Sequence, residues 1–386
     1  MINEMFSHYI YERDSLQNTR FCLEKRRKLK IAYFGGSVTA GYGASDFDTN
    51  GKACDKSSWR AKTTAYFSET YPDAEIESIY AAIGESGTYL GAYRLYDNVI
   101  SKSPDLTFIE FAINDTYGGF DRERAALQFE TIVRELRSAL PFCDIVVLIS
   151  GDKKVFDQYD FFFPTAQGHA DIAEKYNLPL VYMGRALYDR LQKDGIPWDT
   201  HYIDGVHPNN KGYGFYFDVV KCYLENALHT ASVPSAPTVH TIPDKIVSEH
   251  LLDGNRKMVL ASHAMLRENP GWFFSEHNVN PTLSKGGSIA CACVNESNPF
   301  HYTFVGTEFA VFASWYGDHR YCIAIDGGEW KEAAFSNHNP TTVVSGLLSG
   351  PHCVELMPIP NENDLDSVMY IAAVMYRDES KQTVRE

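Results

Sequence analysis

In the first 230 residues, short apolar runs alternate with longer stretches in which apolar residues recur every three or four positions. The short runs are typical of buried strands and are expected at 30–34, 75–81, 106–111, 144–149 and 179–182. The longer stretches are typical of amphipathic helices and are expected at 58–70, 88–101, 121–139, 166–177, 184–193 and 209–228. Because strands that alternate with helices pair in parallel and are covered on both faces, this part is predicted to be an α/β domain.

The pattern changes after residue 230, where Pro, Ser and Thr become frequent and helical periodicity ends. Short alternating segments separated by turns then follow, at 287–294, 301–305, 309–313, 321–325, 352–356 and 368–376. The triplet Asp326-Gly327-Gly328 between two apolar runs indicates a hairpin. We therefore expect a first domain at 1–230, a linker at 231–245 and a C-terminal all-β domain, a jelly-roll or β-sandwich, at 246–386.

The first predicted strand runs into a glycine-rich loop, IAYFGGSVTAGYG, at residues 31–43. A phosphate-binding P-loop is excluded because Tyr42 stands where that motif needs lysine, and the dinucleotide fingerprint lacks its third glycine. The lipase elbow G-x-S-x-G fails because Thr39 occupies the place of the second glycine. What remains is Ser37 at the carboxyl end of a strand, where open α/β sheets bind ligands. Ser37 is a candidate nucleophile, provided that a base and an oxyanion site accompany it.

A candidate base lies in HYIDGVHPNNKGY, residues 201–213. Asp204 and His207 are three residues apart, so the carboxylate can accept a hydrogen bond from Nδ1–H while Nε2 faces outward. The same pair also fits a helix cap beside a surface histidine. The presence of the serine loop in the same domain favours the catalytic interpretation.

Two candidate oxyanion donors follow later strands of the same predicted sheet. Gly87 comes after the second long strand and Asn114 directly after the third, where an amide can donate to a tetrahedral oxyanion. Each residue taken alone also fits an ordinary turn.

In this order the residues resemble the four blocks of the SGNH (GDSL-type) hydrolase superfamily, over residues 30–228. The residues that name the superfamily are Ser37, Gly87, Asn114 and His207. Two positions depart from the usual blocks: Gly36 replaces the aspartate that more often precedes the serine, and Ala112 replaces a glycine. Neither departure removes a catalytic atom.

The resemblance implies a flavodoxin-like three-layer α/β sandwich that carries a serine esterase site. In it Ser37 is the nucleophile, His207 is the general acid and base, and Asp204 orients the histidine. The backbone N–H groups of Ser37 and Gly87 and the amide of Asn114 form the oxyanion hole. No metal and no cofactor is implied.

The triad alone does not name the ester, since members of this superfamily cleave lipids, thioesters and sugar acetates. No strongly apolar lid segment occurs near the predicted triad, which argues against long acyl chains. Trp198, His201 and Tyr202, just ahead of Asp204, are candidate sugar contacts, with core packing as the alternative.

The segment 301–356 is similar to the jelly-roll accessory domains of two-domain carbohydrate esterases. Its pattern is G-T-x-hydrophobic, then a strand ending I-D-G-G, then G-x-H-x-V-x-L. The arrangement of both domains is most similar to the manno-oligosaccharide acetylesterases of carbohydrate esterase family seventeen. Trp272, Trp315 and Tyr316 are further candidates for contacts at the substrate, with burial in the core as the favoured alternative.

The resemblance therefore predicts a serine esterase that removes O-acetyl groups from hemicellulose-derived oligosaccharides, acetylated manno-oligosaccharides first, through an acyl-enzyme. Three alternatives stay open. They are a sugar O-acetyltransferase with the same triad, a lysophospholipase or thioesterase, and a glycan-binding protein with an inactive site.

Charge and cysteine content limit the partners and the cellular location that can be expected. The chain has 50 acidic and 35 basic residues and a formal net charge of −15, which disfavours nucleic acid and anionic membranes as partners. Eight cysteines are scattered without a repeated spacing, and the first residues lack a signal-peptide pattern, so a cytoplasmic location is expected. The predicted partner is an acetylated oligosaccharide, and a homo-oligomer is a further hypothesis.

Overall fold

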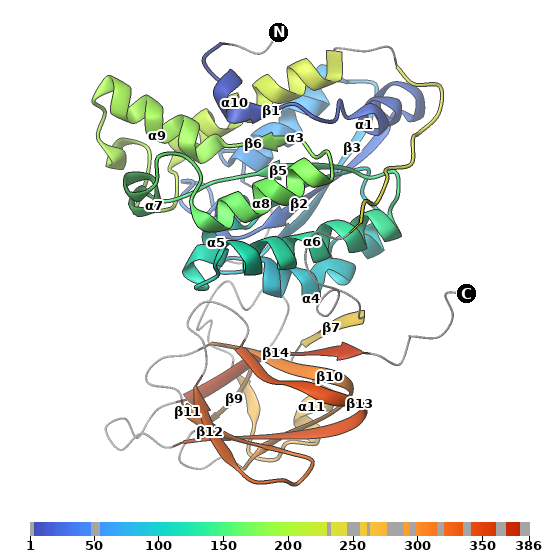
Figure 1. Cartoon of the computed structure of the whole chain (residues 1–386), viewed down its shortest axis with the longest axis vertical. Helices are drawn as coiled ribbons and strands as arrows, with labels where there is room; N and C mark the ends of the chain where they lie inside the picture. Colours follow the sequence, from blue (N-terminus) through green and yellow to red (C-terminus); the bar gives the residue numbers. More distant parts are fainter. Residues whose placement is uncertain are drawn as a thin grey trace. The chain divides into compact units, whose positions relative to one another are not determined.

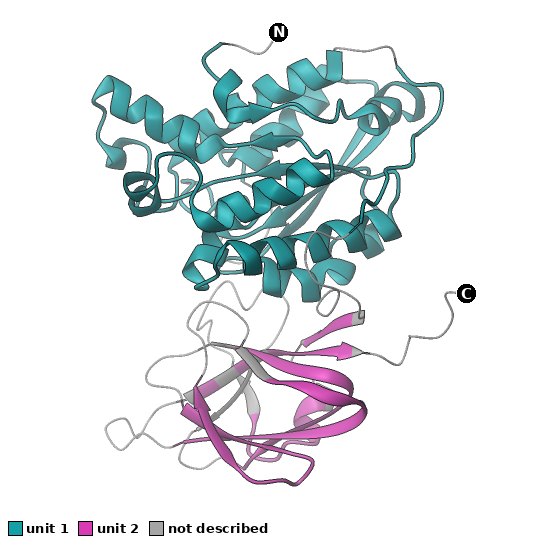
Figure 2. Cartoon of the chain, in the orientation of Figure 1, with its two compact units in different colours: residues 1–48, 52–252 teal, residues 49–51, 253–386 magenta. Residues whose placement is uncertain are grey.

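A computed structural model describes residues 4–47, 55–229, 233–244, 255–260, 263–275, 289–293, 298–314, 320–334, 341–359 and 368–378. The chain divides into two compact units, shown in teal and magenta in Figure 2. Unit 1 comprises Met1–Asp48 and Lys52–Leu252, and unit 2 comprises Thr49–Gly51 and Asp253–Glu386. Among the described residues, no helix combines the length and the apolar character that crossing a membrane requires.

Unit 1 is built on a six-stranded sheet with the order β1-β6-β5-β4-β2-β3. The strands are β1 (Ile10–Tyr11), β2 (Lys28–Gly35), β3 (Glu75–Ala82), β4 (Leu106–Glu110), β5 (Asp144–Leu148) and β6 (Leu180–Val181). Strands β2 to β6 pair in parallel, and β1 adds an antiparallel edge. Without β1 this is the flavodoxin-like order, in which the second strand along the chain lies outside the first. The predicted parallel α/β fold is confirmed.

Helices cover both faces of this sheet, as Figure 1 shows. They are α1 (Gln17–Phe21), α2 (Ser37–Ala40), α3 (Trp59–Thr70), α4 (Thr88–Asn98), α5 (Ala112–Tyr117), α6 (Arg122–Ala139), α7 (Lys153–Gln158), α8 (Pro164–Lys175), α9 (Met183–Asp194) and α10 (Asn210–His229). Side chains of α3, α9 and α10 share one apolar core with the sheet, and those of α4, α6 and α8 share the other. The predicted three-layer arrangement is therefore present.

Three short helices directly behind strand ends were not predicted: α2, α5 and α7. They have four to six residues each, which is too short for an apolar stripe to repeat. Two of them, α2 and α5, begin at or just before candidate site residues.

Unit 2 is an antiparallel sheet with the order β12-β11-β13-β10-β14-β9-β8, and β7 pairs with β14. Its elements are β7 (Asn255–Leu260), α11 (His263–Arg267), β8 (Phe273–Ser275), β9 (Ile289–Cys293), β10 (Phe300–Ser314), β11 (Arg320–Ile325), β12 (Lys331–Ala334), β13 (Thr341–Pro358) and β14 (Val368–Asp378). The all-β class predicted for this part is confirmed. The hairpin predicted at Asp326-Gly327 joins β11 to β12, with φ of 53° and 72° at the two residues and a 2.9 Å bond from Gly328 N to Ile325 O.

Residues 233–244, which lie within the predicted linker 231–245, belong to unit 1 and form extended chain that is hydrogen-bonded to the rest of it. The amide side chain of Asn18 pairs with the backbone of Thr238 in both directions, at 2.8 Å and 2.7 Å. His240 N donates to Pro141 O at 2.8 Å, and Arg137 Nη1 donates to Thr241 O at 2.7 Å.

Candidate active site

Ser37 stands at the carboxyl edge of the sheet, at the start of α2. Strand β2 ends at Gly35, and Gly36 takes an extended conformation as the residue before the helix. The carbonyl of Ser37 accepts hydrogen bonds from the amides of Gly41 and Tyr42, both at 3.0 Å. Gly41, with φ of 91°, closes the turn in a conformation that favours glycine. The glycine-rich loop is thus a strand-to-helix turn that presents a half-buried serine.

Ser37, His207 and Asp204 form a continuous hydrogen-bonded line. Ser37 Oγ lies 2.8 Å from His207 Nε2, and His207 Nδ1 lies 2.7 Å from Asp204 Oδ2. An ionised carboxylate can only accept, so Nδ1 carries the ring proton and Nε2 is left to accept from the serine hydroxyl. This is the geometry of a serine nucleophile with its general base and an orienting carboxylate.

Asp204 is held as a carboxylate by its own loop. Its Oδ1 accepts hydrogen bonds from the amides of Val206 and His207, both at 2.7 Å. Partial burial opposes ionisation, but the bonds from the His207 ring and these two amides outweigh it and lower the pKa of Asp204. The indole Nε1 of Trp198 donates to the backbone carbonyl of Asp204 at 2.9 Å, and this bond helps to hold the loop in place.

Glu110, at the end of β4, fastens the serine loop. Its carboxylate accepts from Thr39 Oγ1 at 2.9 Å and from Ser150 Oγ at 2.6 Å, and its carbonyl accepts from Gly36 N at 3.3 Å. Burial raises the pKa of Glu110 to about 6, although both hydroxyl bonds act in the opposite direction. A buried glutamate from the neighbouring strand therefore holds the loop, and no aspartate at position 36 is required.

The two other candidate oxyanion donors follow the strands on either side of β2. Gly87 is the residue that precedes α4, and Asn114 lies in α5. A β-carbon built on Gly36 would lie 2.2 Å from Asn114 Oδ1, so this amide sits directly against the residue before Ser37. Its oxygen is the buried end and has no hydrogen-bond partner among the described residues, which leaves the NH2 group to donate to a ligand. The strand order thus brings Ser37 and Asn114 to the point where open sheets bind ligands.

The three candidate sugar contacts ahead of Asp204 lie in different surroundings. Tyr202 is only 2% exposed, stacks on Trp198 at 3.6 Å between ring centroids, and shares a 2.9 Å hydrogen bond with the hydroxyl of Tyr216. His201 is half-buried, with Nδ1 at 2.7 Å from Thr200 Oγ1. This placement favours a packing role for Tyr202, whereas Trp198 stays partly exposed.

The candidates in the second domain are not brought to a described site. Trp272 is buried in the core of unit 2 against Phe300, and its Nε1 donates to Asn298 O at 3.0 Å. Trp315 and Tyr316 lie outside the described residues.

Two exposed tyrosines near the hydrogen-bonded line were missed. Tyr42 is 43% exposed and meets the ring of His207 edge-on, with centroids 4.7 Å apart. Tyr117 is also 43% exposed and donates to Asp152; burial first, then Asp152 and the charge of Asp204, raise its pKa. The signal was available, because Tyr42 closes the serine loop and Tyr117 follows Asn114 by three residues.

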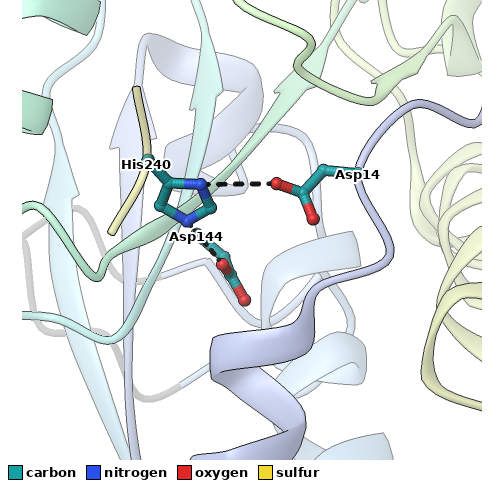
Figure 3. A group of neighbouring side chains, drawn as sticks. All are labelled: Asp14, Asp144 and His240. Carbon is teal, nitrogen blue, oxygen red and sulfur yellow. Dashed lines mark hydrogen bonds and ion pairs between the residues drawn. The ribbon is translucent and has the colours of Figure 1, made fainter. Parts of the chain in front are cut away.

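One group of side chains in the described part of the chain has the composition of a metal site: Asp14, Asp144 and His240 (Figure 3). The imidazole lies between the two carboxylates, with Nε2 at 2.8 Å from Asp144 Oδ1 and Nδ1 at 3.5 Å from Asp14 Oδ2. A metal needs its ligand atoms to face one point, but here each ring nitrogen faces its own carboxylate. The group is better suited to hold the extended segment against the rest of unit 1.

Residues 33–215 match the GDSL-like Lipase/Acylhydrolase family, and this interval contains Ser37, Gly87, Asn114, Asp204 and His207. No curated protein sequence matches the chain.

Two solved structures are similar over almost the whole length. One is the crystal structure of a two-domain esterase (CEX) active on acetylated mannans, with a TM-score of 0.71, 20% identity, and coverage of 96% of this chain and 97% of that chain. The other is the crystal structure of a two-domain esterase (CEX) active on acetylated mannans, co-crystallised with mannopentaose. It has a TM-score of 0.70 and the same identity and coverage. At this level of identity, the likeness shows the two-domain fold.

Proposed function

Residues 33–215 belong to the GDSL-like lipase/acylhydrolase family, and from that premise we propose that this protein is a serine esterase that removes O-acetyl groups from hemicellulose-derived oligosaccharides. The observation that carries the proposal is the line from Ser37 Oγ through His207 to Asp204, at 2.8 Å and 2.7 Å. The whole-length likeness to an esterase active on acetylated mannans supports acetylated manno-oligosaccharides as the first substrates to test.

In the proposed reaction Ser37 Oγ attacks the acetyl carbonyl while His207 Nε2 takes the hydroxyl proton. The negative charge that forms on the carbonyl oxygen meets the backbone N–H of Ser37 and Gly87 and the amide of Asn114. Protonated His207 then gives its proton to the sugar oxygen, which leaves as a free hydroxyl and leaves an acetyl group on Ser37. Each positioned donor contributes about 3 kcal/mol to such a transition state.

The second half repeats these steps with water. His207 removes a proton from water, the hydroxide attacks the acetyl group on Ser37, and acetate leaves as the serine hydroxyl is restored. Because Asp204 keeps a lowered pKa, its carboxylate stays ionised through both halves and stabilises the imidazolium. Side chains of unit 1 supply every proton transfer in this sequence.

The surface around Ser37 supports a polar, ring-shaped substrate. Tyr42 and Tyr117 each expose 43% of their surface beside the line, and such rings pack against the apolar face of a pyranose. The net charge of −15 opposes the binding of anionic lipid.

We also propose that the reaction takes place in the cytoplasm. Cys22 and Cys143 are buried free thiols, and burial raises the pKa of both, which suits a reducing compartment. Fractionation of cells that produce the full chain tests this: esterase activity in the soluble intracellular fraction supports it, and activity outside the cell contradicts it.

The test of the substrate is a comparison of esters under one set of conditions. Acetylated manno-oligosaccharides, acetylated xylo-oligosaccharides and nitrophenyl esters of increasing acyl length are each incubated with the protein, and acetate or acid release is measured. We expect mass loss of acetyl groups from the mannosides and a steep fall in rate beyond short acyl chains. Release from long acyl esters with none from any acetylated glycan would contradict the proposal.

A further inference from the structure

Arg94 is a fully buried arginine in α4 whose guanidinium reaches the base of the candidate oxyanion site. Its Nη2 donates to Gly35 O at 2.9 Å and to Ser86 Oγ at 3.0 Å. Its Nη1 donates to the carbonyl of Ala81 and, at 3.2 Å, to Asn98 Oδ1. All four partners are neutral oxygens.

Among the residues that the structure describes, none is an acidic partner for the charge of Arg94. In the part of the chain that the structure describes it forms no ion pair, and its guanidinium lies over the rings of Phe34 and Phe111, at 4.5 Å and 5.6 Å. Burial lowers the pKa of Arg94 to about 9, so the side chain still carries its charge at neutral pH. A buried charge without a counter-charge costs stability, which calls for a compensating role.

The position of Arg94 suggests what this role is. Gly35 comes two residues before Ser37, and Ser86 comes directly before Gly87. One nitrogen, Nη2, contacts both segments, so it fixes the spacing between the two loops whose backbone N–H groups are the candidate oxyanion donors.

Asp115 makes the corresponding link on the other side of Gly87. Its buried carboxylate accepts from the backbone N–H of Thr88 at 2.7 Å and from the Thr88 hydroxyl at 2.9 and 3.0 Å. His169 Nε2 lies 2.9 Å from the same carboxylate, and its ring stacks on Phe129 with centroids 4.3 Å apart. Asp115 follows Asn114 in α5, so it ties the start of α4 to the residue that bears the third donor.

We propose that Arg94 and Asp115 form a brace of opposite charges that positions the oxyanion donors of Ser37, Gly87 and Asn114. Arg94 joins the serine loop to the Gly87 loop, and Asp115 joins the Gly87 loop to Asn114. The positive charge of Arg94, buried behind the serine loop, also favours the negative charge that develops on the substrate oxygen. The inference rests on the proposed function, because it needs an oxyanion to form at this place.

The brace differs from ordinary core packing in what it changes. Donors that are misplaced by a fraction of an ångström bind the ground-state ester as before but stabilise the oxyanion less, so kcat falls while KM is retained. A purely structural role would lower thermal stability without a selective loss of affinity for a tetrahedral adduct.

The test uses the full chain, nitrophenyl acetate, and a boronic acid that forms a tetrahedral adduct with serine. Arg94→Lys keeps a cation but not the fork, and Asp115→Asn keeps the shape but not the charge. Arg137→Lys is the matched control, since Arg137 is another buried arginine that donates to a carbonyl, that of Thr241. We expect kcat to fall about 10- to 100-fold in both brace variants at unchanged KM, with boronate affinity falling in parallel, and no change in the control.

Where Arg94→Lys fails to fold, Thr88→Val serves instead, because it removes only the hydroxyl that Asp115 accepts; about a 3- to 10-fold lower kcat is expected. Brace variants with wild-type kcat, or with lower kcat but undiminished boronate affinity, overturn the inference. A wild-type enzyme whose activity does not depend on Ser37 overturns the proposed function instead, so the two failures are distinguishable.

Discussion

The side chain of Asn114 occupies the space into which a side chain on residue 36 would point. A β-carbon built on Gly36 would lie 2.2 Å from Asn114 Oδ1 and 2.9 Å from its Cγ, distances that real contacts do not reach. The position of the Asn114 amide therefore requires a glycine at residue 36, directly before Ser37.

We expect Gly36→Ala to lower kcat for nitrophenyl acetate by at least about tenfold, because the new methyl group displaces the Asn114 amide from the oxyanion. Gly214→Ala is the control, since nothing lies within 4 Å of a β-carbon at that position in α10. Initial rates and far-ultraviolet circular dichroism measure the two variants side by side. Full activity in Gly36→Ala would show that Asn114 is not held against this residue.

The buried carboxyl of Glu110 gives the protein a pH-dependent stability. Its pKa is raised from 4.5 to about 6, so folding favours the protonated form. The stabilisation is complete below about pH 4.5 and is lost as the pH rises through 6. Glu110→Gln does not titrate, so the difference in unfolding free energy between pH 4.5 and pH 7 should shift by about 2 kcal/mol relative to the wild type.

Urea unfolding of both proteins at the two pH values measures this shift. If the free energy of unfolding of the wild type and of Glu110→Gln changed identically with pH, the pKa of Glu110 would not be raised in the folded protein.

The exposed Tyr42, which contacts the ring of His207, and Tyr117, which senses the charge of Asp204, give a test of sugar recognition. We expect Tyr42→Ala and Tyr117→Ala to raise KM for acetylated manno-oligosaccharides about 5- to 10-fold, as the loss of one stacking contact would, and to leave KM for nitrophenyl acetate nearly unchanged. Tyr96→Ala is the control, because Tyr96 is 62% exposed in α4. Equal effects on both substrates would place these tyrosines outside sugar binding.

The extended segment after α10 gives a test of stability. Asn18 is 2% exposed and makes three hydrogen bonds to backbone groups, two with Thr238 and one with Phe142 O. We expect Asn18→Ala to lower the free energy of unfolding of unit 1 by roughly 2–4 kcal/mol, because it leaves buried backbone groups unpaired. Asn226→Ala, at a partly buried asparagine whose amide donates an exposed hydrogen bond to Glu12, should cost about 0.5 kcal/mol or less.

Urea unfolding compares these two asparagine variants, and esterase activity at low temperature should be kept in both. A loss in Asn18→Ala no larger than in Asn226→Ala would mean that Asn18 does not hold the segment against the rest of unit 1.

Much of the fold could be predicted from the sequence because the patterns that indicate its strands and helices are local. The apolar runs that became β2, β4 and β5 are buried over most of their length, and helices such as α6 are long enough for an apolar stripe to repeat. The same logic predicted that Ser37 and Asn114 would share one sheet edge, and the structure places them there. Strand β10 was predicted as two strands because a bulge between Gly306 and Glu308 interrupts its alternation.

Other features have no local signal. Arg94 acts through carbonyls of segments far away in the sequence, and nothing in its own helix marks it as part of the site. Tyr202 lies between Trp198 and Asp204 in the sequence. A tyrosine at this position fits either sugar stacking or core packing, and only its burial in the structure distinguishes the two. Helices α2 and α5 are set by tertiary hydrogen bonds, such as that from Gly36 N to Glu110 O, which no periodicity reveals.

The central claim is that Ser37 carries the acetyl group during hydrolysis of acetylated oligosaccharides. The most direct measurement is acid quenching of the wild type and Ser37→Ala during turnover of acetylated manno-oligosaccharides, followed by peptide mass spectrometry and acetate release, with exposed Ser101→Ala as control. We predict one acetyl group on the peptide containing Ser37 in the wild type and in the control. In Ser37→Ala we predict no acetylated peptide and at least about a thousandfold slower release. Acetate release by Ser37→Ala at the wild-type rate would contradict the claim.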